Sequence, residues 1–65
     1  SLYTAQWVEA DDPHKLNKFI DTNKANMAED HNGSPVFLAR NAWRLDKAIE
    51  NYPDLRFLKT KEQLI

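Results

Sequence analysis

The chain opens with an alternation of apolar and polar side chains. Tyr3, Ala5 and Trp7 alternate with Thr4 and Gln6, and this period of two is typical of a half-buried β-strand that is rich in β-favouring residues. The pattern therefore predicts a strand over residues 2–8.

A helical spacing of apolar residues follows the predicted strand. Asp12 before Pro13 predicts a helix start, because Asp offers an N-cap acceptor and the proline ring suits the first helical position. Four apolar residues then share one stripe at roughly 100° per residue: Leu16, Phe19, Ile20 and Met27. We expect this helix to run from Asp12 to about Asp30 and to end at residues 31–33, where Asn and Gly tolerate a left-handed exit.

Asn23 interrupts this stripe at nearly the same angle as Leu16. One interpretation is that the buried part of the helix is short, so that Asn23 lies beyond the edge of the core. The other is a buried polar group that fixes the register of a partner helix, as asparagines do in coiled coils. Burial separates the two.

Residues 35–52 admit two interpretations. As one helix they would carry a narrow apolar stripe, but Val36 and Trp43 would then lie in water on the far side. As a strand over 36–40 followed by a helix from Ala42 to Tyr52 with Asn41 as N-cap, they leave less apolar surface exposed. We favour the second interpretation, with Pro53 ending the helix.

The predicted elements add up to an α+β domain. Residues 55–59 alternate like a strand, and Thr60 with Gln63 has the capping-box spacing for a last helical turn. The order is β-α-β-α-β, with two helices packed on a short, mostly parallel or mixed sheet. The alternative is an all-α three-helix domain. In either case we expect Phe19, Leu45 and Ile49 in the core, with Ile49→Ala costing about 2 to 5 kcal/mol.

Length and composition limit the chain to one small globular domain, residues 1–65. Its first residue is Ser1 and its last residues are apolar, so we expect a fragment or processed form of a longer chain. There is no cysteine and therefore no disulfide. No apolar run approaches the roughly 20 residues that span a bilayer, so no membrane partner is expected.

Catalytic and cofactor motifs are not evident in the sequence. Gly33 is the one glycine, whereas phosphate-cradling loops need several. Three clustered residues and a second imidazole raise the possibility of a metal site: Asp11, Asp12, His14 and His31. The aspartates already have a capping role and no second ligand cluster exists, so we expect no metal, no cofactor and no enzymatic activity.

The candidate binding residues are Trp43, Arg40, Arg44, Lys47 and Trp7. On a helix the three basic residues share a face at i, i+4 and i+7, beside the indole of Trp43, where they could follow phosphates while the indole stacks on a base. Asp46 and Glu50 stand near them and favour ion pairs on a solvated face instead. Residues 1–32 hold three Lys and six acids, and residues 33–65 hold six basic residues and four acids, for a net charge of −1. The excess of +2 in the second half is far from the strongly basic surface expected of a nucleic-acid-binding domain.

These exclusions favour a non-catalytic protein-interaction or regulatory binding module. Aromatic residues and arginine are enriched at interface hot spots, so the contact surface is expected near Trp43 or Trp7. The expected partner is another protein or a domain of the same longer chain. The alternative is a nucleic-acid-binding domain that uses the face of Arg40, Arg44 and Lys47 with Trp43.

Overall fold

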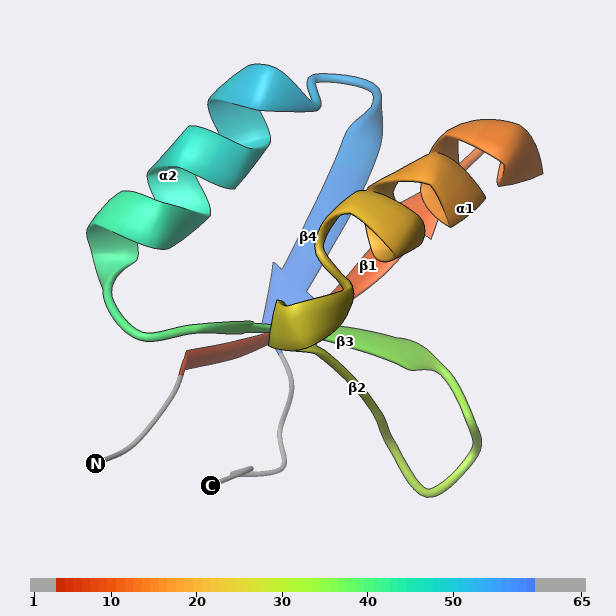
Figure 1. The fold of residues 1–65 in the computed structure, drawn as a ribbon, viewed down its shortest axis with the longest axis horizontal. Coiled ribbons are helices and arrows are strands. Elements are labelled where there is room, and N and C mark those ends of the chain that lie inside the picture. Colours follow the sequence, from red (N-terminus) through yellow and green to blue (C-terminus); the bar gives the residue numbers. More distant parts are fainter. Residues whose placement is uncertain (1–3, 60–65) are drawn as a thin grey trace.

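The structure, a computed structural model, describes residues 4–59 and contains four strands and two α-helices (Figure 1). The elements follow in the order β1 (Thr4–Ala10), α1 (Pro13–Thr22), a short 3₁₀ turn η1 (Lys24–Asn26), β2 (Met27–Glu29), β3 (Pro35–Ala39), α2 (Ala42–Asn51) and β4 (Leu55–Lys59). The α+β class is confirmed, and an all-α fold is not supported. The predicted turn at residues 60–63 lies outside the described residues.

The sheet is antiparallel throughout, with the strand order β2-β3-β1-β4. Helix α1 connects β1 to β2, and helix α2 connects β3 to β4. In each case one antiparallel strand lies between the two connected strands in the sheet. This is the ferredoxin-like arrangement of two split β-α-β units. The prediction of a mostly parallel or mixed sheet was wrong because the sequence pattern missed β2. At three residues, β2 is too short to display a period of two.

The two interpretations of residues 35–52 are resolved in favour of strand and then helix. Residues 35–39 form β3, and the side chain of Asn41 caps α2 by accepting a hydrogen bond from the Arg44 backbone N–H at 3.0 Å. The start of α1 also forms as expected. There the Asp12 carboxylate accepts from the His14 N–H at 2.9 Å, and Pro13 takes the first helical position.

Helix α1 is shorter than expected, because it ends at Thr22. Asn23 is its C-cap, and both the backbone N–H and the side-chain amide of Asn23 donate to the Phe19 carbonyl, at 2.9 and 3.0 Å. Met27, expected on the helical stripe, instead reaches the core from β2. Asn23 therefore lies at the end of the helix and not at a helix–helix contact. This agrees with the interpretation that the buried part of the helix is short.

Residues 31–33 form the hairpin turn between β2 and β3 and not a helix exit. Gly33 has φ +81°, the left-handed conformation that glycine adopts without strain. The Asp30 carboxylate accepts from the backbone N–H groups of Asn32 and Ser34, at 2.8 and 2.9 Å. The prediction of a left-handed residue at residues 31–33 was correct. The element that precedes this residue is the strand β2 and not the predicted helix.

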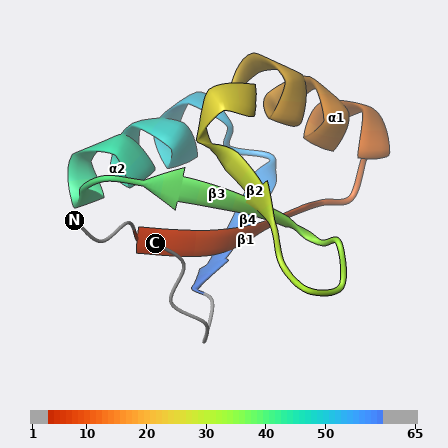
Figure 2. The ribbon, with the colours of Figure 1, turned by 60° about the horizontal axis from the view of Figure 1, so that its bottom comes forward.

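Both helices lie on the same side of the sheet, where the core forms (Figure 2). Phe19 is fully buried, and its ring meets those of Phe37, Tyr52 and Phe57 edge-on, with centroids 4.7 to 5.6 Å apart. Edge-to-face packing adds to the area that these rings bury. Gln6 is also buried on this side, and no described residue donates to its side-chain oxygen.

No helix in residues 4–59 is long and apolar enough to cross a membrane.

Ile49 is a correction to the expected core, because it is 47% exposed. The buried face of α2 is centred on Ala48, with Leu45 and Tyr52 packed against the core. The apolar stripe of the one-helix interpretation of residues 35–52 also includes Leu38, which the structure places in β3. The buried face of α2 is instead formed by Leu45, Ala48 and Tyr52, so the small Ala48 side chain takes the place expected for Ile49.

Candidate functional site

The first half of α2 presents three of the predicted binding residues together. Trp43, Arg44 and Lys47 are all exposed, and Trp43 is 64% exposed. The Lys47 Nζ lies 5.9 Å from the centroid of the Trp43 ring, a cation–π contact. Because Asn41 fixes the start of the helix, these side chains project from its first two turns.

An open hollow of about 200 Å³ lies beside these side chains. Its other wall comes from the end of α1 and the 3₁₀ turn, and its floor comes from β3 and the core side of α2. The lining residues are Asn23, Asn26, Phe37, Trp43, Arg44, Lys47, Ala48, Asn51 and Tyr52. We call this hollow the Trp43 end of the interhelical groove.

A second hollow of about 240 Å³ adjoins the first, since Asn51 and Tyr52 line both. It lies between α1 and the loop after α2. Its lining residues are Lys15, Lys18, Asn51, Tyr52, Pro53, Asp54 and Leu55. We call it the Lys15 end, and the two ends together form the interhelical groove.

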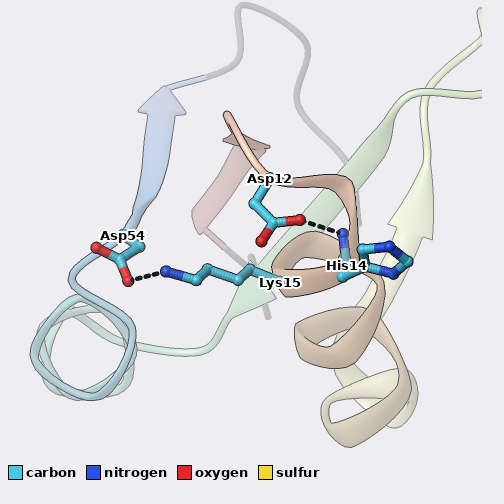
Figure 3. A network of polar contacts seen from close by, with 4 residues as sticks. All are labelled: Asp12, His14, Lys15 and Asp54. Atoms are coloured by element: carbon cyan, nitrogen blue, oxygen red, sulfur yellow. Dashed lines mark hydrogen bonds and ion pairs between the residues drawn. The ribbon is translucent and has the colours of Figure 1, made fainter.

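The charges along this groove are mainly positive. Its lining holds four cations, Lys15, Lys18, Arg44 and Lys47, and one carboxylate, Asp54. Asp54 is already paired with Lys15 (Figure 3), with 2.7 Å between Lys15 Nζ and Asp54 Oδ2. This hydrogen bond holds the pKa of Lys15 above its ordinary value. Lys15 therefore stays cationic at neutral pH.

The expected ion pairs of the α2 cations with their neighbours on the helix are not formed. Among residues 4–59, neither Asp46 nor Glu50 comes within 4.0 Å of the charged groups of Arg44 or Lys47. The described ion pairs lie elsewhere, and Arg56 accounts for two of them, with Asp11 at 3.0 Å and Glu9 at 3.5 Å. The charges of Arg44 and Lys47 therefore face solvent and the groove.

The other two predicted binding residues do not reach this groove. Arg40 is exposed but precedes α2, so it does not continue the helical face of Arg44 and Lys47. Trp7 lies in β1, where its cross-strand partners are Val36 on β3 and Leu58 on β4. Its side chain is on the side of the sheet away from the helices. Its indole N–H donates to the Asp30 carboxylate at 2.9 Å, which ties it to the β2–β3 turn.

The two aspartates considered for a metal site serve other contacts. In Figure 3 the Asp12 carboxylate points to the His14 backbone N–H as the cap of α1. Asp11 pairs with Arg56, and His31 lies in the β2–β3 turn. Within the described part of the chain, no three His, Cys, Asp or Glu side chains gather as metal ligands would.

Sequence reasoning missed most of the groove. The amides of Asn23, Asn26 and Asn51 lie in three separate segments, and Lys15 and Lys18 come from a helix that had no assigned role. The break in the apolar stripe at Asn23 was the one available signal. Comparison with models of known protein families gives no match for this chain.

Proposed function

We propose that this chain is a non-catalytic protein-binding module that docks its partner at the interhelical groove, with Trp43 as the anchor. The observation that carries the proposal is the exposure of Trp43. At 64% exposed, it is the one exposed aromatic side chain among residues 4–59, and it stands at the rim of a groove.

In the folded chain the Trp43 indole remains largely in contact with water. An exposed indole contributes little to folding, because hydrophobic stabilisation scales with the apolar area removed from water. The same indole would bury a large area on a partner, and Trp and Arg dominate interface hot spots. Arg44 lies beside Trp43, and the hollow next to them can receive a partner side chain.

Selection from a displayed peptide library tests this proposal. The immobilised chain should enrich peptides, and Trp43→Ala should weaken their binding by about 2 kcal/mol, or roughly 30-fold, as expected for a hot spot. Ile49→Ala is the matched control, since Ile49 is exposed on the same helix but does not line the groove. Equal losses in the two variants, or no enriched peptide, would contradict the proposal.

A nucleic-acid-binding function is the second candidate, because Trp43 lies beside Arg44 and Lys47, which no described carboxylate pairs. Single-stranded binders use several stacking platforms along a basic track, whereas this groove offers one exposed indole. We expect no oligonucleotide binding tighter than about micromolar at physiological salt. Tighter, salt-sensitive binding that disappears in the double variant Arg40→Glu, Arg44→Glu would favour this candidate.

A further inference from the structure

The chemistry of the interhelical groove specifies more than a generic docking surface. Four cations line it against one carboxylate, in a chain whose net charge is −1. The positive charge is therefore local to the groove. We infer that the groove binds a short acidic segment of a partner protein, an inference that rests on the proposed docking function.

The two ends of the groove suit different parts of such a segment. At the Trp43 end, Arg44 and Lys47 offer donors without a described carboxylate partner, and a guanidinium binds a carboxylate in a bidentate geometry. At the Lys15 end, Lys18 is the corresponding cation, because Lys15 is shared with Asp54. Acidic side chains spaced along one segment would contact both ends.

The neutral lining fits a polypeptide between these charges. Asn23, Asn26 and Asn51 present side-chain amides, which can donate to a carbonyl and accept from an N–H. One N–H of the Asn23 amide is already bonded to the Phe19 carbonyl, so its second N–H is the donor that faces a ligand. A peptide backbone carries both groups at every residue except proline, whereas phosphates only accept. The groove also has apolar lining residues, among them Phe37 at the Trp43 end and Leu55 at the Lys15 end. Uncharged side chains of the segment can pack there between the acidic ones.

NMR titration of the ¹⁵N-labelled chain tests this inference. The probe is an acetylated and amidated peptide of alternating Glu and Leu, its neutral control has Gln in place of Glu, and a third arm uses oligothymidylate. The acidic peptide should shift the Trp43 indole N–H and the side-chain amides of Asn23, Asn26 and Asn51. The Trp7 indole, on the other side of the sheet, is the internal reference and should not move.

Charge reversal completes the test. Arg44→Glu and Lys47→Glu should each weaken binding of the acidic peptide about tenfold, because attraction is replaced by repulsion. Lys59→Glu makes the same change in net charge on β4, outside the groove, and should change binding less than about twofold. An unchanged far-UV circular dichroism spectrum and urea midpoint in each variant verify that the fold is intact.

The outcomes separate this inference from the proposed function. Equal binding of the Glu and Gln peptides, or equal losses in all three charge variants, would overturn the acidic segment and leave docking at Trp43 standing. Library-selected peptides that are neutral or basic would do the same. Oligothymidylate that shifts Trp43 at lower concentration than the acidic peptide would overturn both in favour of nucleic acid.

Discussion

The two sides of the sheet bury apolar side chains by different means. On the helix side, Phe19 descends from α1 into a cluster of rings, so that burial comes from packing one layer on another. On the other side, no described helix covers the strands, yet Val36 is fully buried. Its cover includes its cross-strand partners, Trp7 on β1 and Ala28 on β2.

This difference separates global from local stability. A core residue that joins two layers supports the whole fold, whereas a residue covered by its neighbours in the sheet supports mainly its own strands. Trp7 illustrates the second case, because its hydrogen bond to Asp30 links the centre of the sheet to one turn. The same side chain was a candidate contact residue in the sequence, and its bond to Asp30 gives it a structural role as well.

The largest effect is expected at Phe19. Phe19→Ala would leave a cavity where three rings now meet, and should lower the free energy of unfolding by about 3 to 5 kcal/mol. A domain of this size has little stability to spare, so the variant should be largely unfolded. Circular dichroism without denaturant detects this unfolding, and a variant that stays folded and loses less than about 1 kcal/mol in urea denaturation would contradict the assigned core.

Val36→Ala tests the opposite side of the sheet. Removing the buried methyl groups should lower the free energy of unfolding by about 2 kcal/mol, less than at Phe19, because fewer atoms are lost and the cavity is smaller. The same denaturation measurement applies. A loss equal to that of Phe19→Ala would show that the two sides of the sheet contribute alike to global stability.

Ile49→Ala should cost less than about 1 kcal/mol, because the side chain is already 47% exposed. This value replaces the 2 to 5 kcal/mol expected from the sequence stripe. Leu45→Ala, on the packed side of the same helix, is the comparison and should cost more. If Ile49→Ala cost more than Leu45→Ala, Ile49 and not Ala48 would lie on the buried face of α2.

The smallest effect is expected from acid, and it should be local to the side of the sheet that bears Trp7. The Ser34 N–H, then the Trp7 indole and the Asn32 N–H, hold the pKa of Asp30 below its ordinary value, although partial burial opposes them. Because the pKa is lower in the folded chain, the stabilisation is present above the unfolded pKa of about 3.9 and is lost as pH falls through the folded value.

Amide and indole exchange followed from pH 7 to pH 2 measures this effect, because the range must extend below the lowered pKa of Asp30. The Trp7 indole and the Asn32 and Ser34 amides should lose protection as Asp30 takes up a proton, while the Trp43 indole provides a reference remote from Asp30. In Asp30→Asn the pH dependence of these three groups should disappear. Persistence of the titration in that variant would assign it to another group.

The sequence by itself determined the features that depend on near neighbours in the chain. Asp12 with Pro13 and Asn41 mark helix starts because a cap bonds to a backbone N–H two or three residues away. The alternation in β1 and β4 and the stop at Pro53 are equally local. These signals were sufficient for the α+β class and for most element boundaries.

Tertiary structure alone decided the features that join distant segments. Strand β2 exists because three residues pair with β3, not because of their own pattern. The rotation of α2 follows from its packing on the sheet, which favours Ala48 over Ile49. The groove brings Asn23 and Asn26 close to Trp43, which lies about 20 residues further along the chain. The spacing of residues around Trp43 does not predict this contact. Such contacts depend on how layers meet, a quantity that no short stretch of sequence encodes.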